Sequence, residues 1–440
     1  MSSANLYIPS STPYNWSLCV GNSWDGSTAE QIYNGTVSVP SLVTFSTCGY
    51  NLNVNVTTVV DDNGDTKCFT NTSACSIRSA WNTCISVYGS CDCAIHLLPN
   101  AVFFMENPLT ADTSSNYFPA YGITMYGNHA TVIGSQFISV TNVNFTLVNF
   151  SVTNATMGAI NLYGSYGNME LRDMTFRNNE ANVGGAIYST SSITIERSVF
   201  DNNMATYGGS IFWTQDTSDP LNLLISQSSF FNSYAEAYGG VIWISGSSEA
   251  SGAQPSIVTI ESSNFVDAVA NNHGGGIFFA NPSIKVYMKE CKFLECVSEE
   301  GGGVYFASVS SVLIDGCDFE GNEALNSYGG GIVLVNVDDI NVSNTTFSRN
   351  KASFHSGGVY LESVNNALID GCYFEGNEAL NSYGGGIVLV NVDDINVSDT
   401  TFSRNKASIS SGGAIYIEGS QNVRITSMNI VENEALRGAG

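Results

Sequence analysis

The sequence predicts an all-β fold, a parallel β-helix in which successive coils of the chain stack along one axis. One segment is written twice, because Leu313–Ser353 returns 55 residues later as Leu368–Ser408 with two differences. Inside each copy lies a unit of about half that length, and an internal repeat of this size indicates a solenoid. Its short runs of Val, Ile, Tyr and Phe are bounded by Gly, Asn, Asp and Ser, as is typical of strands and turns. One unit cannot bury its apolar face alone, whereas stacked copies share a continuous core.

The unit starts with a Phe, followed by an Asn three residues on, an Ala two residues after that, and a Gly-Gly pair that opens an aliphatic strand. The starting positions are Phe176, Phe200, Phe230, Phe265, Phe293, Phe319, Phe347, Phe374, Phe402 and Ile430. If each coil lies over the last at the inter-strand spacing of about 4.8 Å, these side chains form one inner file. The file is expected most clearly in the duplicated part, at Phe319, Phe347, Phe374 and Phe402.

The Asn position predicts a ladder, because stacked Asn side chains can hydrogen-bond from one coil to the next. The expected ladder residues are Asn179, Asn203, Asn322, Asn350, Asn377, Asn405 and Asn433. The position next to the Asn carries alternating charge in the last coils, with Glu323, Lys351, Glu378, Lys406 and Glu434. With neighbouring coils in register, opposite charges meet at every step, and a slip by one coil would place like charges together.

The Phe-x-x-Asn and Gly-Gly-Ala-Ile elements resemble the repeats of the chlamydial polymorphic outer membrane proteins. Residues 176–179 with 184–187 match this pattern, and residues 402–405 with 412–415 match it again. The resemblance covers roughly residues 170–440 and depends on the repetition of the two elements. It implies a right-handed parallel β-helix that serves as a surface-exposed, adhesin-like passenger.

The net charge of −25, from 39 acidic and 14 basic residues, argues against nucleic acid as a partner, since that binding needs Lys and Arg against phosphates. No apolar run approaches the ~20 residues of a membrane-spanning helix. The first residues have neither a basic segment nor an apolar core, so we expect no signal peptide. The chain stops at Arg437–Gly440, where the next Gly-Gly strand is due, so we expect a C-terminally truncated solenoid.

Residues 1–95 are expected to form a disulfide-rich cap over the N-terminal end of the solenoid. They lack the repeat and hold seven of the eleven cysteines, namely Cys19, Cys48, Cys68, Cys75, Cys84, Cys91 and Cys93. Clustered cysteines indicate disulfides and an oxidising compartment, with reduced structural thiols or a metal site as the alternatives. The Cys-Asp-Cys at 91–93 is closer than the usual zinc spacing. Residues 96–171 are expected to form irregular first coils, and residues 172–440 the regular ones.

Three groups of residues could carry chemistry. Asp338-Asp339 and Asp393-Asp394 lie at turns two coils apart, and either are solvated or form a calcium or substrate site. Asp61–Asp65 has an acidic spacing but lacks the Gly and Glu of an EF-hand, so it is an acidic turn or a calcium site. The histidines, His96, His129, His273 and His355, show no metal spacing. Cys291 and Cys317 occupy one position on adjacent coils, where a disulfide and two buried thiols are equally compatible with the spacing.

Two functions follow from these observations. The first is a non-enzymatic, adhesin-like or structural β-helix, extracellular or at the cell surface, with a glycan or a cell-surface protein as partner and no cofactor other than calcium. It is favoured because near-identical coils extend a surface without building a unique site. The alternative is a carbohydrate-active β-helix enzyme, a polysaccharide lyase or glycoside hydrolase. Lyases need cationic groups against the substrate carboxylates, whereas the duplicated Arg and Lys residues alternate with Glu.

Overall fold

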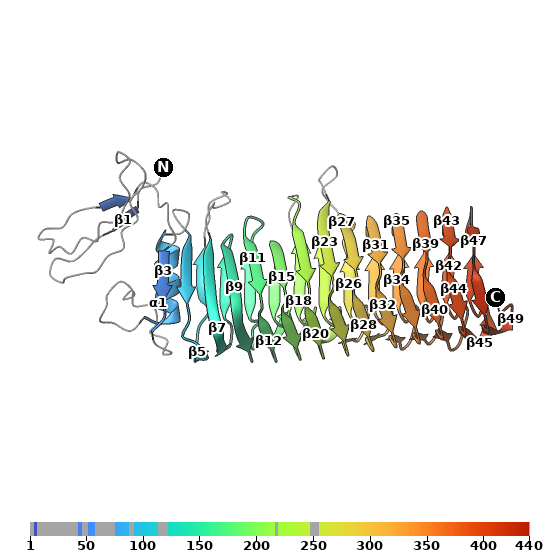
Figure 1. The fold of residues 1–440 in the computed structure, drawn as a ribbon, viewed down its shortest axis with the longest axis horizontal. Helices are drawn as coiled ribbons and strands as arrows, with labels where there is room; N and C mark the ends of the chain where they lie inside the picture. Colours follow the sequence, from blue (N-terminus) through green and yellow to red (C-terminus); the bar gives the residue numbers. More distant parts are fainter. Residues whose placement is uncertain are drawn as a thin grey trace, which may run out of the picture.

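A computed structural model of the chain describes residues 4–6, 43–45, 52–57, 75–87, 92–112, 122–215, 219–246 and 255–439. These residues form a parallel β-solenoid, drawn lengthwise in Figure 1, in which each coil of the chain lies beside the next along one axis. The all-β parallel β-helix predicted from the repeats is confirmed. Each regular coil contains four short strands, and each strand pairs in parallel with its equivalent one coil away.

Two parallel ladders follow one another along each coil. The strands of the first ladder are β11 (Asn168–Arg172), β15 (Ser192–Glu196), β19 (Asn222–Ser226), β23 (Ser256–Glu261), β27 (Ile284–Lys289), β31 (Ser311–Asp315), β35 (Asp339–Ser343), β39 (Asn366–Asp370), β43 (Ile395–Ser398) and β47 (Arg424–Thr426). The strands of the second ladder, which carry the Phe positions, are β12 (Thr175–Arg177), β16 (Val199–Asp201), β20 (Ser229–Phe231), β24 (Asn264–Val266), β28 (Lys292–Leu294), β32 (Asp318–Glu320), β36 (Thr346–Ser348), β40 (Tyr373–Glu375), β44 (Thr401–Ser403) and β48 (Asn429–Val431).

Two separate sheets complete the coil. The ten-stranded sheet consists of β13 (Glu180–Val183), β17 (Met204–Tyr207), β21 (Tyr234–Tyr238), β25 (Val269–Ala270), β29 (Val297–Ser298), β33 (Glu323–Ala324), β37 (Lys351–Ala352), β41 (Glu378–Ala379), β45 (Lys406–Ser411) and β49 (Glu434–Arg437). The twelve-stranded sheet, which follows the Gly-Gly pairs, consists of β6 (Leu109–Asp112), β8 (Ile138–Thr141), β10 (Ile160–Tyr163), β14 (Ile187–Ser189), β18 (Ile211–Gln215), β22 (Ile242–Gly246), β26 (Ile277–Ala280), β30 (Val304–Ala307), β34 (Ile332–Val335), β38 (Val359–Glu362), β42 (Ile387–Val390) and β46 (Ile415–Glu418).

The first coils are less regular than the later ones. The strands β3 (Leu52–Asn55), β4 (Cys93–His96) and β5 (Val102–Met105) lead into the long strands β7 (Ile123–Gly134) and β9 (Asn144–Thr153), which span both ladders. Parallel pairing therefore already includes β3, on the N-terminal side of the boundary expected near residue 95. The domain boundaries stay a prediction. The strands β1 (Ala4–Leu6) and β2 (Val43–Phe45) form a separate antiparallel pair.

A single described helix, α1 (Ile77–Val87), contacts β3, β4 and β6 at the N-terminal end of the solenoid (Figure 1). Its Trp81 is fully buried, donates a hydrogen bond from Nε1 to the Thr110 carbonyl at 3.1 Å and packs edge-on against Phe145. The helix thus covers apolar surface of the first coils. A cap was expected from this segment of the sequence, but a helix was not predicted. Across the described residues, no helix has the length and apolar character needed to cross a bilayer.

Candidate binding surface

The expected Phe positions lie together inside the second ladder. Consecutive rings from Phe176 to Phe402 stack with centroid distances of 4.5 to 5.1 Å, and each of these rings is completely buried. The contact between Phe319 and Phe347, at 5.1 Å, falls within the duplicated part of the chain. The file is interior, so it holds coils in register and offers no group to a ligand.

The expected Asn residues form hydrogen-bonded columns beside the Phe file. Asn350 shows the pattern, because its Nδ2 donates to Asn377 Oδ1 at 2.9 Å and to the Phe319 carbonyl at 2.8 Å. One run of linked side chains extends through Asn322, Asn350, Asn377, Asn405 and Asn433, and Asn179 donates to Asn203 in the earlier coils. Between the two runs stand Ser233, Ala268 and Cys296, so the column is interrupted. Every amide in the longer run is satisfied, which makes it a structural feature.

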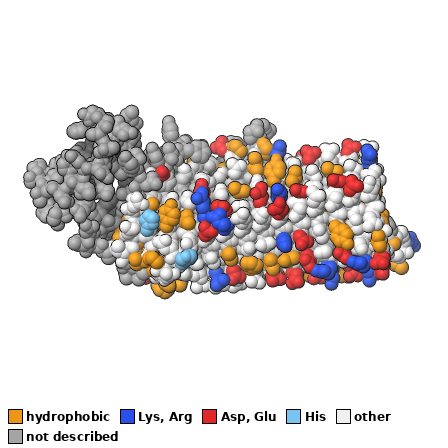
Figure 2. Space-filling view, in the orientation of Figure 1, with side chains coloured by type: hydrophobic (Ala, Val, Ile, Leu, Met, Phe, Trp, Pro, Cys, Tyr) orange, Lys and Arg blue, Asp and Glu red, His pale blue; other side chains and the backbone are white. Residues whose placement is uncertain are grey.

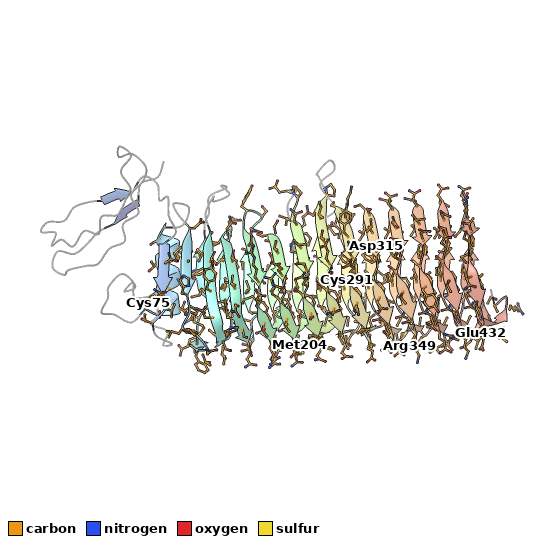
Figure 3. The ribbon with its side chains drawn as sticks, viewed as in Figure 1. Cys75, Met204, Cys291, Asp315, Arg349 and Glu432 are labelled. Atoms are coloured by element: carbon orange, nitrogen blue, oxygen red, sulfur yellow. A yellow bond between two sulfur atoms is a disulfide. The ribbon has the colours of Figure 1, made fainter. Side chains whose placement is uncertain are left out.

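The alternating charges meet in the expected register, since Glu323 pairs with Lys351, Lys351 with Glu378, Glu378 with Lys406, and Lys406 with Glu434. Of these contacts, an ion pair forms between Lys406 Nζ and Glu378 Oε1 at 3.4 Å. Arg349 and Arg404 pair instead with Glu320 and Glu375 on the neighbouring ladder. Arg349 lies along the margin of the solenoid in Figure 3, as does Met204. Figure 2 shows acidic and basic side chains beside one another on this face.

The cysteines fall into two groups. Cys84 and Cys93 form a disulfide with a Cα–Cα distance of 5.5 Å, and Cys75 is also disulfide-bonded. The candidates Cys19, Cys48, Cys68 and Cys91 lie outside the described residues. Cys291, Cys296, Cys317 and Cys372 are buried free thiols in the solenoid, so the disulfide considered for Cys291 and Cys317 is not formed. Burial raises the pKa of the Cys296 thiol to about 12, which makes it unreactive.

The paired aspartates are exposed at turns and are held by amides of the next coil. Asn365 Nδ2 donates to Asp338 Oδ1 and Asn366 Nδ2 to Asp339 Oδ1, both at 2.9 Å. Asp339 and its neighbours line a shallow hollow of about 480 Å³ on the first ladder. Nowhere in the described ranges do three His, Cys, Asp or Glu side chains gather as metal ligands. The acidic turn Asp61–Asp65 lies outside those ranges.

A different set of side chains gathers on the outer face of the twelve-stranded sheet. Three residues after the second glycine of each pair, the strand points a large side chain away from the core, and these positions lie in register from coil to coil. Several of these side chains, among them Val333, Tyr360 and Val388, are buried beneath neighbouring rings. They read Tyr188, Phe212, Trp243, Phe278, Tyr305, Val333, Tyr360, Val388 and Tyr416. We call this column together with the one described next the aromatic face.

The second column of the aromatic face stands at the corner just before the glycines. It reads Tyr207, Tyr238, His273, Glu300, Tyr328, His355 and Tyr383. Glycine is required next to it because a Cβ on Gly240 would lie 2.0 Å from the Gly275 carbonyl oxygen, and Gly274 has a φ of +66°. The close approach of the coils at this corner brings the corner rings onto the strand rings. Tyr328 stacks on Tyr360 at 4.7 Å, and Tyr383 stacks on Tyr416 at 4.2 Å.

The two histidines of the aromatic face lie among tyrosine rings. His273 contacts Tyr238 at 5.3 Å and Tyr305 at 4.8 Å, and His355 contacts Tyr328 at 4.9 Å and Tyr383 at 5.4 Å. Burial lowers the pKa of both imidazoles, although Glu300 near His273, and Glu418 and Glu362 near His355, oppose that shift. Both side chains are therefore neutral at physiological pH.

Three buried polar atoms on this face make no hydrogen bond, namely His273 Nδ1, His355 Nδ1 and Trp243 Nε1. Glu300 Oε2 lies 3.3 Å from His273 Nδ1 but is not aligned for a hydrogen bond. These three nitrogens thus lie enclosed among the rings without a hydrogen-bond partner among the described residues.

Three carboxylates accompany the rings. Glu362, at the end of β38, and Glu418, at the end of β46, lie in register two coils apart, whereas Glu300 stands in the corner column before β30, where Ala307 takes the position equivalent to Glu362. Tyr360 Oη donates to Glu362 at 3.0 Å, and Tyr416 Oη donates to Glu418 at 3.1 Å. Burial, followed by the charges of Glu300 and Glu362, raises the pKa of Tyr305 to about 12. The corner column continues beyond Tyr383 with Ser411 and ends at Arg437, which pairs in register with Ser411.

Sequence reasoning missed this face because the histidines were considered singly. Aligning the units on their Gly-Gly pairs would have revealed it, since the aromatic residues recur immediately before and three residues after the glycines. The face offers flat apolar contact, neutral imidazoles and carboxylates. This combination suits binding.

The regular coils match two sequence families. Residues 173–190 match the Chlamydia polymorphic membrane protein repeat, and residues 232–378 and 275–440 match the right handed beta helix region. Both the expected resemblance and the handedness that it implies are thus confirmed. Comparison with curated protein sequences gave no match.

Among solved structures, the surface adhesin PfbA of Streptococcus pneumoniae is similar to this chain, with 11% identity, a TM-score of 0.46, and coverage of 83% of this chain and 88% of the adhesin. The periplasmic alginate epimerase AlgG has 9% identity, a TM-score of 0.39 and coverage of 77% of each chain. Tailspike protein 3 of bacteriophage CBA120 has 13% identity, a TM-score of 0.40 and coverage of 84% and 61%. The chain is a right-handed parallel β-helix protein, and its residues 173–190 match the repeat of the Chlamydia polymorphic membrane proteins.

Proposed function

We propose that the protein is a non-enzymatic, adhesin-like binding protein of the cell surface or extracellular space, and that the aromatic face is its binding surface. The observation that carries this proposal is the corner column of the aromatic face, whose partly exposed rings continue over many coils above a mostly buried strand column. Aromatic side chains gathered on the outside of a protein mark interaction sites. Tyr and Trp are also the residues that contribute most to binding interfaces.

Two further features support this role. The interior columns of Phe and satisfied Asn side chains make the solenoid a stiff scaffold, which presents its outer face without rearrangement. The Cys84–Cys93 disulfide suits an oxidising compartment outside the cytosol. The matched repeat belongs to a family named for membrane proteins, and this favours the cell surface.

The test is binding of the full chain to cultured cells and to arrays of glycans and cell-surface proteins, compared with a variant carrying Tyr328→Ser and Tyr383→Ser. We expect saturable binding to at least one class of ligand, and its loss in the variant. A control variant with Tyr373→Ser removes an exposed ring on β40, away from the aromatic face, and should bind normally. Turnover of a polysaccharide that is lost on changing Asp339 to Asn would instead establish the enzymatic alternative.

A further inference from the structure

The ligand of the aromatic face can be narrowed by its charge and its period. This step rests on the proposed function and concerns the same surface. The carboxylates on its outward positions are Glu300, Glu362 and Glu418, a single cation, Arg437, stands at the C-terminal end of the corner column, and His273 and His355 are neutral. Neither Glu362 nor Glu418 has a Lys or Arg within salt-bridge distance among the described residues, whereas Glu320, Glu375 and Glu378 elsewhere on the solenoid do.

Carboxylates without cationic partners beside aromatic rings are complementary to a positively charged ligand. An anionic ligand, such as a uronate or sulfated polymer, would place like charges beside these carboxylates. Lys and Arg side chains suit both the rings and the carboxylates, because their aliphatic stems can lie along apolar rings while their charged ends reach a carboxylate. The rings of Tyr328 and Tyr383 form the ridge beside the carboxylates and would contact those stems.

The spacing of the tyrosines along the solenoid axis indicates the conformation of the ligand. Tyr305, Tyr360 and Tyr416 lie two coils apart, with Val333 and Val388 between them. Two coils correspond to about 9.6 Å, twice the inter-strand spacing of about 4.8 Å. A polyproline II helix has three residues per turn and rises about 3.1 Å per residue, so residues i and i+3 point the same way about 9.3 Å apart. In an extended β-strand, by contrast, residues i and i+3 point to opposite sides.

We propose that the aromatic face binds a basic polypeptide segment in the polyproline II conformation, with Lys or Arg at every third residue. Successive cations lie against the two carboxylates that are in register, Glu362 and Glu418, and the intervening residues lie over the tyrosine ridge. Aromatic-lined grooves recognise polyproline II segments in other folds for the same reason, because that helix is already extended and loses little entropy on binding.

Copying of the chain does not explain the period. The duplicated segments, Leu313–Ser353 and Leu368–Ser408, contain Tyr328 and Tyr383, but the carboxylates and their tyrosines lie outside them. Residues 299–312, 354–367 and 409–422 differ from one another, yet each contributes a Tyr three residues after its glycines and a Glu close by. The duplicated segments therefore supply Val333 and Val388 but neither the tyrosines nor the carboxylates between which they lie.

The test measures the affinity of the full chain, by fluorescence anisotropy at physiological ionic strength, for labelled peptides. The probe has Lys at every third position among prolines, and a matched peptide of the same composition has its lysines contiguous. We expect the spaced peptide to bind about fivefold more tightly, since only it can place two or more cations on carboxylates at once. Glu362→Gln and Glu418→Gln should each weaken its binding about threefold to fivefold.

The control for general attraction by an acidic protein is the pair of variants Glu320→Gln and Glu375→Gln. These remove the same charge from the second ladder and should change the affinity less than about twofold. Equal weakening by both sets of variants, or equal affinity for both peptides, would overturn the inference.

A neutral oligosaccharide and a peptide with Glu in place of Lys complete the panel. Binding of the oligosaccharide that depends on Tyr328 and Tyr383, without binding of the basic peptide, would leave the proposed function standing and replace the ligand class. Failure of every ligand and of whole cells to bind would instead contradict the proposed function itself.

Discussion

The inner Asn column and the outer aromatic face run along the same coils but follow different rules. The inner column repeats the same residue in every coil from Asn322 to Asn433, whereas the outer face alternates over two coils. An interior amide must be satisfied by the coil before it and the coil after it, and Asn meets both demands at once. The outer strand column has no such chain of hydrogen bonds, because Val333, Tyr360 and Val388 pack as a buried apolar cluster beneath the corner rings. Packing of this kind constrains the volume of a side chain more than its identity, so different residues can alternate from coil to coil.

The largest effect should come from breaking the inner column. Asn377→Ala removes the acceptor of both the N–H and the Nδ2 of Asn350, and the donor to the Phe347 carbonyl, all of them buried. Because buried groups left unpaired cost about 1–3 kcal/mol each, we expect the free energy of unfolding to fall by about 2–4 kcal/mol. Urea titration measures this, and faster hydrogen exchange at the Asn350 amide locates it.

The matched control is Asn365→Ala, which removes one hydrogen bond from an exposed side chain to Asp338. It should change the free energy of unfolding by less than about 0.5 kcal/mol. Similar losses in the two variants would mean that the buried column holds the coils together no better than a surface contact does. The distinction between the two regions would then be lost.

A smaller effect on stability and a larger one on binding are expected for the outer face. Tyr383→Ser removes one ring from the stack on Tyr416, and an aromatic pair contributes about 0.5–1.5 kcal/mol. We therefore expect a stability loss of about 1 kcal/mol, measured by urea titration, together with loss of ligand binding. If the Tyr383→Ser variant is destabilised as expected but still binds the ligand, the ring serves packing alone.

How much of the difference between the inner columns and the aromatic face can be predicted from the sequence depends on whether a position repeats the same residue in each coil. Phe319 and Asn350 recur in nearly every coil, so their columns could be placed from spacing alone, because identical residues at a fixed interval must superimpose in a solenoid. Tyr305 and His355 belong to columns in which the residue changes from coil to coil, and no single-residue repeat marks them. The helix α1 lies in a segment without any repeat, where only its packing against the first coils, through Trp81, decides its conformation.

Acidification should destabilise the aromatic face more than the inner Asn column. The pKa of His273 and of His355 is lowered from 6.5 in the folded state by burial, so the unfolded chain binds more protons just below that pH. Stability contributed by the neutral imidazoles is thus present above about pH 6.5 and is lost as the pH falls below it. The melting temperature should decrease over this range, and less so in a variant with His273→Gln and His355→Gln. An unchanged pH profile in that variant would assign the acid sensitivity to other groups.

The smallest effect should come from the exposed charge column beside the inner one. Lys406→Glu places three glutamates in successive coils, at positions 378, 406 and 434, and replaces the contact of 3.4 Å with Glu378 by repulsion. Exposed pairs contribute only about 0.2–1 kcal/mol, so we expect a loss below about 1 kcal/mol at low salt. In about 1 M salt, where the screening length falls to about 3 Å, the loss should nearly disappear. A loss that persists at high salt would mean that the aliphatic stem of Lys406, and not its charge, supports the coil, and alternating charge would then have no part in fixing the register.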